Sequence, residues 1–114
     1  LGVALSQQNR LPEAEAALGK AVELDPRNSE HQVDLGFTLL FLGKHDLAES
    51  AFRAGLDLRA DDARARNGLA AVLTEKGRLD EAERLFRQSL QADPQDPFAR
   101  QGLAEIERRR AAGG

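Results

Sequence analysis

The chain has 114 residues, room for one small domain, and its balance of 41% hydrophobic and 31% charged residues argues against a disordered tail. Phe is the only aromatic residue type and Cys is absent, so a β-sandwich is disfavoured and disulfides, thiolate metal sites and a cysteine nucleophile are excluded. A net charge of −3 gives no electrostatic footprint for nucleic acid or an anionic membrane, and no apolar run approaches the roughly 20 residues needed to span a bilayer.

Self-similarity is the strongest signal in the chain, because the sequence aligns with itself, without a gap, when it is shifted by 34 residues. The recurring residues are large apolar, small or helix-ending ones. The clearest columns are Leu1, Leu35, Leu69 and Leu103; Ala14, Ala48 and Ala82; Leu18, Phe52 and Phe86; and Pro26 with Pro94. The agreement extends over the whole chain and predicts a repeat protein.

Apolar residues recur at helical spacing within each 34-residue unit. In chain order, this pattern predicts seven helices at residues 1–8, 12–24, 29–42, 46–58, 63–76, 80–92 and 97–110. Helix starts are indicated by a capping-box pattern at Ser29 with Gln32, and by Asp96 followed by Pro97. Gly43 follows a helical stripe, where a left-handed cap residue is needed, and Gly77 repeats this one unit later.

Small residues in the repeat indicate how its helices pack. Gly36, Ala48 and Gly55 alternate with large neighbours, so two helix backbones can approach closely while the large side chains fill the adjoining spaces.

A 34-residue helix–turn–helix with this column order resembles the tetratricopeptide repeat (TPR) family, whose pattern reads W-x-x-L-G-x-x-Y…A-x-x-x-F…P. The second unit shows it best, with Leu35-Gly36, then Ala48, then Phe52. The family's Trp is replaced here by polar residues, namely Gln32, Arg66 and Arg100. The resemblance covers essentially the full chain and implies an all-α, right-handed α-solenoid of antiparallel helix pairs with a C-terminal capping helix.

The same resemblance divides the chain, taken as one TPR domain over residues 1–114. It implies a partial first repeat at 1–28, complete repeats at 29–62 and 63–96, and a capping helix with a tail at 97–114. Because Leu1 falls in the middle of a helical unit, we expect further residues upstream of it.

No arrangement of residues predicts a catalytic, cofactor-binding or metal site. His31 and His45 are the only histidines, and we interpret them as surface residues. The run Arg108–Arg110 is interpreted as a solvated last turn that complements the helix dipole, rather than as an anion site. Paired acids in the first turns of helices are explained in the same way: Glu13 with Glu15, and Glu81 with Glu83. We therefore expect no enzyme activity and no cofactor.

In the TPR family, the first helices of successive repeats line a concave groove that receives a peptide or a partner helix. Carried over by position, this geometry implies a partner-binding groove formed by Val33, Phe37, Leu40, Phe41, Arg64, Asn67, Ala71, Thr74, Phe98 and Gln101. The helix at 29–42 is apolar nearly all round, which indicates burial on more than one side. Packing on neighbouring repeats explains Leu40 and Phe41 equally well, but it explains Val33 and Phe37 less well.

One type of TPR domain clamps the C-terminal carboxylate of heat-shock chaperones with Lys, Asn and Arg side chains on successive first helices. The corresponding positions here do not match that pattern: Val33, Phe37, Gly68, Phe98 and Gly102. The sequence therefore predicts a mixed apolar and polar groove instead of a chaperone-tail clamp.

We predict a non-catalytic protein–protein interaction scaffold that binds a peptide or helix segment, with no nucleic-acid partner and no membrane insertion. Two alternatives stay open: a self-assembling, homo-oligomeric module, and a substrate-recruiting arm of a larger enzyme or complex. The sequence does not identify the partner, the organism or the compartment, although a cytoplasmic location is favoured over a periplasmic or secreted one.

Overall fold

The computed structural model describes residues 10–113 of the chain. Over that range the chain folds into six helices and contains no strand: α2 (Leu11–Leu24), α3 (Ser29–Phe41), α4 (His45–Leu58), α5 (Ala63–Glu75), α6 (Leu79–Ala92) and α7 (Pro97–Gly113). These helices confirm six of the seven predicted ones, while the helix predicted at 1–8 lies outside the described residues. None of the described helices is both long and apolar enough to cross a membrane.

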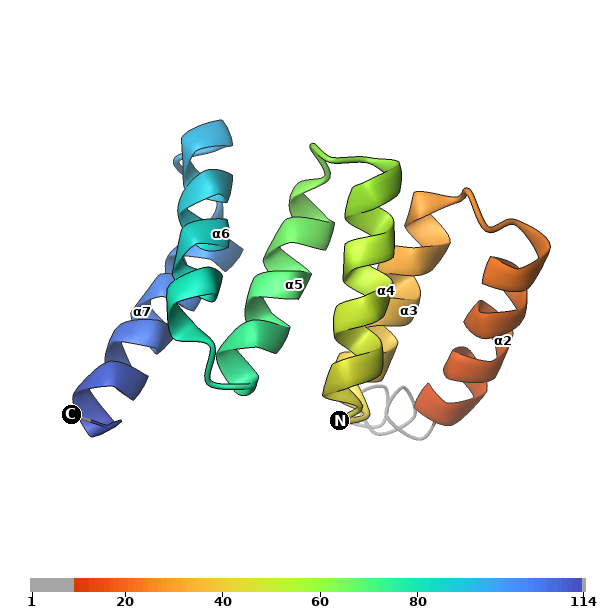
Figure 1. Cartoon of the computed structure of the whole chain (residues 1–114), viewed down its shortest axis with the longest axis horizontal. Coiled ribbons are helices and arrows are strands. Elements are labelled where there is room, and N and C mark those ends of the chain that lie inside the picture. Colours follow the sequence, from red (N-terminus) through yellow and green to blue (C-terminus); the bar gives the residue numbers. More distant parts are fainter. Residues whose placement is uncertain (1–9, 114) are drawn as a thin grey trace.

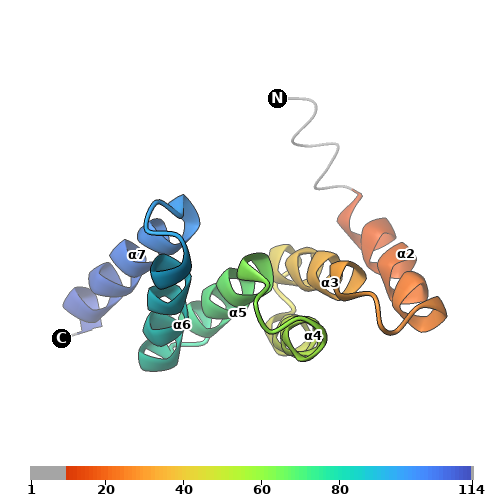
Figure 2. The same ribbon diagram turned by 90° about the horizontal axis from the view of Figure 1, so that it is seen from above.

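Consecutive helices pack against each other from α2 to α7 and form a short α-solenoid (Figure 1). Seen from above, α2 and α7 rise at the two ends of a curved array, and α4 lies beneath α3 and α5 (Figure 2). In addition, α5 contacts both α3 and α7, the helices two places away from it in the chain. The helices α3, α5 and α7 therefore form a continuous layer, with α5 at its centre.

Three of the helices begin with an Asn or Asp whose side chain accepts a hydrogen bond from a backbone N–H of the first turn, at positions 34 residues apart: Asn28, Asp62 and Asp96. The start predicted at Asp96 is confirmed. The capping box predicted at Ser29 with Gln32 is wrong, because Asn28 supplies the capping acceptor one residue earlier and Ser29 is already the first residue of α3.

The turn inside each helix pair ends the first helix with a glycine in the left-handed region, as predicted. Gly43 has φ +79° and Gly77 has φ +82°. A side chain would be strained in this conformation, so glycine allows the chain to reverse direction within a few residues.

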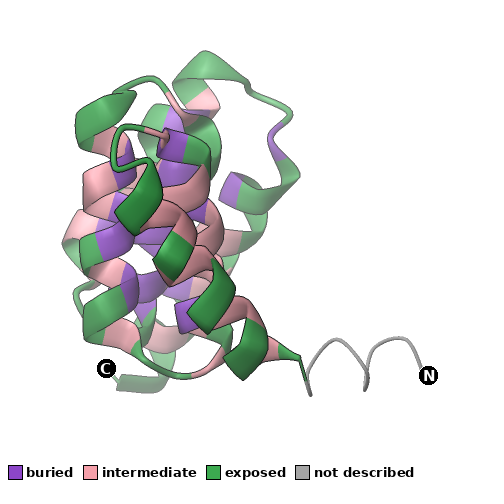
Figure 3. Cartoon of the chain, turned by 90° about the vertical axis from the view of Figure 1, so that its right-hand side faces the viewer, coloured by how far each residue is buried: buried purple, intermediate pink, exposed green. Residues whose placement is uncertain are grey.

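Two buried phenylalanines form the centre of the core. The ring of Phe52, which is fully buried, lies between Gly36 on α3 and Gly68 on α5, and a Cβ on either glycine would overlap it. Phe86 occupies the equivalent place one repeat later, against Gly102 on α7. Figure 3 shows the buried residues facing the spaces between helices. Large rings packed on small residues therefore set how closely the helices approach, as the repeat pattern predicts.

Candidate partner-binding groove

The layer formed by α3, α5 and α7 carries the residues predicted to bind a partner. Its central helix, α5, presents a small side chain, Ala71, between the larger side chains of the flanking helices. Helix α4 covers α3 and α5 from one side (Figure 2), and no other helix of residues 10–113 covers the opposite face of the layer. We call this face the groove.

Three phenylalanines from α3 and α7 come together on the groove, and we call Phe37, Phe41 and Phe98 the aromatic cluster. The Phe37 ring centroid lies 6.4 Å from that of Phe41 and 6.4 Å from that of Phe98, which it meets edge-on at 71°. Phe37 also rests edge-on against the core ring of Phe52, 4.9 Å away. The outer members remain open to solvent, with Phe41 69% and Phe98 49% exposed. The cluster therefore spans the groove from α3 to α7 and is anchored in the core.

Arg64 on α5 completes the cluster. Its guanidinium carbon lies 5.3 Å from the centroid of the Phe37 ring, within the range of a cation–π interaction. The same guanidinium donates a hydrogen bond of 3.0 Å from Nη2 to Oδ1 of Asp34. Arg64 is thus held between an aromatic face and a carboxylate of this chain.

A pocket of about 270 Å³ adjoins Phe98 between α5 and α7. Two of the residues that line it are small, Ala71 on α5 and Gly102 on α7. Its lining combines apolar and polar side chains: Ala71, Thr74, Glu75, Phe86, Phe98, Gln101, Gly102, Glu105 and Arg108. The volume and lining suit an apolar side chain with polar groups beside it.

Three residues predicted to line the groove are buried instead, which corrects the sequence-based assignment. Val33 is fully buried because Gly55 has no side chain, and a Cβ there would lie 3.0 Å from Val33 Cγ2. Thr74 is 4% exposed, and its hydroxyl donates to the carbonyl of Ala70. Asn67 is 5% exposed, and its Nδ2 donates to Oδ2 of Asp96.

The other predicted residues do lie at or beside the groove, and their contact with a partner stays a prediction. Phe41, Arg64, Phe98 and Gln101 are exposed, while Ala71 and Phe37 are half-buried. Leu40 is half-buried against the core, in keeping with packing on neighbouring repeats.

The sequence argument did not predict that the groove's cations pair with acids of the same chain. Arg109 donates to Glu75 on α5 at 2.9 Å and to Glu105 within α7 at 2.8 Å, while Arg108 donates to Glu105 at 2.6 Å. The hydrogen bond from Arg109, followed by that from Arg108, holds the pKa of Glu105 below its ordinary value. The i, i+4 spacing of Glu105 and Arg109 was the one local signal, whereas the pairing with Glu75 joins residues 34 positions apart.

The interpretation of Arg108–Arg110 as a solvated turn is also corrected. Arg109 pairs with α5, and Arg110 donates to Asp80 at 2.6 Å and to Glu83 at 3.0 Å on α6. These side chains reach back to earlier helices, so they join the last helix to the rest of the solenoid.

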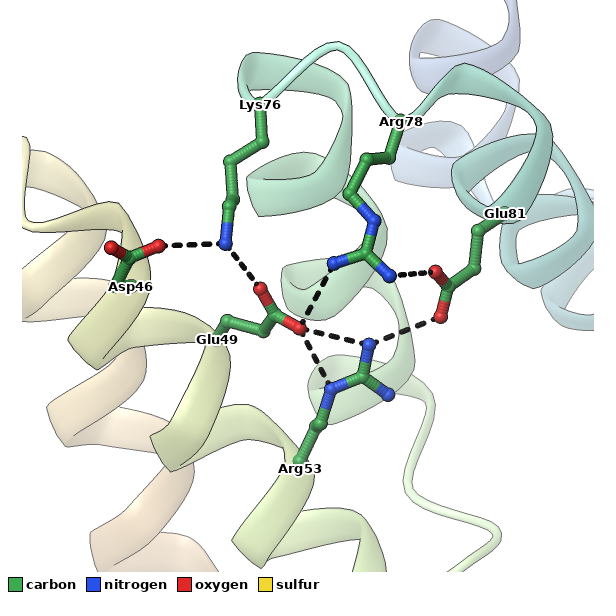
Figure 4. A network of polar contacts seen from close by, with 6 residues as sticks. All are labelled: Asp46, Glu49, Arg53, Lys76, Arg78 and Glu81. Carbon is green, nitrogen blue, oxygen red and sulfur yellow. Dashed lines mark hydrogen bonds and ion pairs between the residues drawn. The ribbon is translucent and has the colours of Figure 1, made fainter.

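A second set of ion pairs lies outside the groove, at the junction of α4, α5 and α6 (Figure 4). Glu49 accepts from Lys76 at 2.6 Å and from Arg53 at 2.9 Å, and Arg53 also donates to Glu81 at 3.1 Å. The hydrogen bond from Lys76, with that from Arg53, holds the pKa of Glu49 below its ordinary value despite partial burial. A carboxylate stabilised in its charged form is a poor general acid or base near neutral pH, so we interpret the network as structural.

Neither histidine is a surface residue as predicted, since His31 and His45 are both half-buried. Among residues 10–113 there is no group of three or more His, Asp or Glu that could ligate a metal ion.

Solved structures resemble this fold closely. The first TPR of Spaghetti (RPAP3) bound to HSP90 peptide SRMEEVD has a TM-score of 0.86 and 23% identity, over 96% of this chain and 87% of that chain. The Yersinia enterocolitica type III secretion chaperone SycD, in complex with a peptide of the translocator YopD, has a TM-score of 0.80 and 20% identity, over 98% and 88% of the two chains. A thermophilic TPR protein of Thermus thermophilus has a TM-score of 0.74 and 28% identity, over 86% of this chain and 50% of that chain.

Comparison with curated protein sequences gives no significant match. The sequence profiles of the tetratricopeptide repeat do match, at residues 33–97 and at residues 1–28. The first of these matches alone covers more than half of the chain. The chain therefore belongs to the tetratricopeptide repeat family.

Proposed function

We propose that the chain is a non-catalytic scaffold whose groove binds a peptide or a helix of another protein. The observation that carries this proposal is the aromatic cluster. Phe41 and Phe98 expose large apolar side chains on one face of a folded domain, next to a pocket that no side chain of the described residues fills. Exposed apolar side chains that cluster in this way usually mark a site of interaction with another molecule.

Two similar structures support the proposal, because each is bound to a peptide. The Spaghetti domain holds an HSP90 peptide, and SycD holds a peptide of a translocator. The proposal includes the division of the chain into a partial repeat at 1–28, complete repeats at 29–62 and 63–96, and a capping helix with a tail from 97. On this division the groove is formed by the first helices of the two complete repeats and by the capping helix.

A selection from a displayed library of random 12-residue peptides tests the proposal without knowledge of the partner. We expect peptides that bind the wild-type chain and bind Phe41→Ala or Phe98→Ala at least about tenfold more weakly, a loss of about 1.4 kcal/mol. Both residues are better choices than Phe37, since Phe37 also packs on the core ring of Phe52. Circular dichroism should show unchanged helicity in both variants.

Leu47→Ala is the matched control, because Leu47 is a 56% exposed apolar residue on α4, outside the groove. Equal loss of binding in Leu47→Ala, or selected peptides that ignore Phe41 and Phe98, would contradict the assignment of the groove. Sedimentation across a range of concentrations tests the self-assembly alternative. An oligomer that dissociates in Phe41→Ala would show that the groove binds a second copy of this chain.

A further inference from the structure

The exposed cations of the groove are each paired with a carboxylate of the same chain. Arg64 donates to Asp34 at 3.0 Å, and Arg108 donates to Glu105 at 2.6 Å. Arg109 donates to Glu75 at 2.9 Å and to the carbonyl of Thr74 at 3.2 Å. A carboxylate from a partner would have to compete with these acids for the same donors, so among the described residues the groove offers no unpaired arginine to an acidic segment.

Helix α5 also holds a buried acceptor with no hydrogen-bond partner in residues 10–113, on the side that carries groove residues. Because the carboxylate of Asp96 only accepts, the Asn67 nitrogen must face it, and Asn67 Oδ1 is left buried with no hydrogen-bond partner among the described residues. Asn67 lies three residues after Arg64 and four before Ala71, so all three share one face of α5. An unpaired buried acceptor destabilises the folded chain, and a donor from a bound segment would remove that cost. At 5% exposure, Asn67 becomes accessible only when a neighbouring side chain moves.

The remaining features of the groove also suit a positive charge. Glu30 lies four residues before Asp34 on α3, so the two share the face that also carries Phe37 and Phe41. Among the described residues, the ionisable side chains of the groove are then four acids and three cations: Glu30, Asp34, Glu75 and Glu105, with Arg64, Arg108 and Arg109. The exposed rings of Phe41 and Phe98 are further acceptors for a cation, in the way that Phe37 already accepts Arg64.

We propose that the groove selects an apolar segment that carries Lys or Arg, and that it discriminates against acidic tails. The inference rests on the proposed function, since it specifies the partner of the same groove. An apolar side chain of the segment enters the pocket beside Phe98. The neighbouring cation lies against the exposed aromatic rings and acidic side chains, and the segment supplies the donor that Asn67 lacks. This preference is opposite in charge to the peptide SRMEEVD bound by the Spaghetti domain.

The charge of the peptides selected in a Phe98-dependent manner tests this inference. We expect Lys and Arg to be enriched over the starting library, and substitution of these residues by Glu in a synthesised peptide to weaken binding at least about tenfold in fluorescence polarisation. Affinity for the basic peptide should fall as salt is raised. A Phe98-dependent pool that is neutral or acidic would overturn the inference and leave the proposed function intact. Absence of any Phe98-dependent peptide would overturn both.

Variants that remove the carboxylate partners of the groove's arginines give a second test. In Asp34→Asn/Glu105→Gln, the side chains of Arg64 and Arg108 lose their carboxylate partners, so the preference for basic peptides should shrink and binding of SRMEEVD should rise. The double variant Asp57→Asn/Glu107→Gln makes the same change of charge at exposed positions outside the groove and is the matched control. If both double variants change selectivity equally, net charge and not the pairing within the groove sets the preference, and the inference fails.

Discussion

The two junctions on either side of α4 are built from equivalent positions 34 residues apart, yet one carries a network of ion pairs whereas the other is largely apolar and open. In the junction of α4, α5 and α6, Arg53 lies between Glu49 and Glu81. In the junction of α2, α3 and α4, the position of Arg53 is taken by Gly19 and that of Glu81 by Leu47. A pocket of about 360 Å³ lies there, and a Cβ on Gly19 would meet no neighbouring atom within 4 Å in the part of the chain that the structure describes.

One ion pair is nevertheless common to both junctions. Glu15 accepts from Lys44 at 2.8 Å, and at the equivalent positions Glu49 accepts from Arg78 at 3.5 Å. The helices therefore stack in the same order whether or not an arginine is present at position 19 or 53. We infer that the apolar columns and glycines define the stacking, and that the additional ion pairs of the second junction add stability without determining the fold.

The largest expected effect comes from removing the ring at the centre of the core, between α3 and α5. Phe52→Ala deletes a fully buried side chain held between Gly36 and Gly68, and should lower the free energy of unfolding by about 3–5 kcal/mol. Leu18→Ala is the equivalent change on α2, where Leu18 is only half-buried, and should cost less. Urea unfolding followed by circular dichroism measures both, and a larger loss in Leu18→Ala would contradict the comparison.

Glycines in the two regions should respond to the same substitution with opposite signs. In Gly68→Ala, the new methyl overlaps the Phe52 ring, so the free energy of unfolding should fall by about 1–3 kcal/mol. Gly19 lies in the middle of α2, and the methyl of Gly19→Ala points into open space beside the helix. The better helix propensity of Ala should therefore raise the free energy of unfolding by up to about 1 kcal/mol. Thermal and urea unfolding measure the two differences, and changes of the same sign would show that packing does not distinguish the two sites.

The contrast between these glycines shows how far sequence reasoning reaches. The 34-residue period predicts the helices, the turns at Gly43 and Gly77, and the role of Phe52, because each depends on local spacing or on a repeated column. The same period does not show that Val33 is buried, since that depends on Gly55 of the next helix.

In the candidate site, too, local sequence patterns predicted some features and not others. The sequence identified the three phenylalanines, because they are apolar residues beyond those needed for the core stripe. The pairing of Asp34 and Glu75 with arginines was not predicted, since each arginine lies about one repeat away, and no local pattern specifies which surface charges meet.

Protonation should weaken the ionic junction selectively. The pKa of Glu49 is lowered in the folded state by the hydrogen bonds from Lys76 and Arg53, so its contribution is fully present above the pKa of the unfolded chain, about 4.3. That contribution is lost as the pH falls through the lower pKa of the folded state. Glu49→Gln should therefore cost about 1 kcal/mol at pH 7, the upper end for a solvent-screened ion pair, and progressively less as the pH falls below about 4.3.

Urea unfolding of the wild-type chain and Glu49→Gln at several pH values measures this dependence. Asp57→Asn is the control on the same helix, since Asp57 is exposed near the C-terminal end of α4, where a negative charge opposes the helix dipole. The free energy of unfolding of Asp57→Asn at pH 7 should be no lower than that of the wild-type chain. A cost of Glu49→Gln that is independent of pH would mean that packing, and not charge, is what the carboxylate contributes.

The smallest effect is expected when the ion pairs of the α4–α5–α6 junction are recreated in the α2–α3–α4 junction. Gly19→Arg and Leu47→Glu place an arginine and a glutamate where Arg53 and Glu81 stand one repeat later, with Glu15 already present in the position of Glu49. A double-mutant cycle should give a favourable coupling of about 0.5 kcal/mol that falls at high salt, as expected for a partly exposed ion pair. Repeating the cycle with Gly19→Met, which improves helix propensity without adding charge, should give no coupling. Equal coupling in the two cycles would show that filling the pocket matters and charge does not, whereas coupling confined to arginine would show that the ionic layer can be moved between junctions without altering the fold.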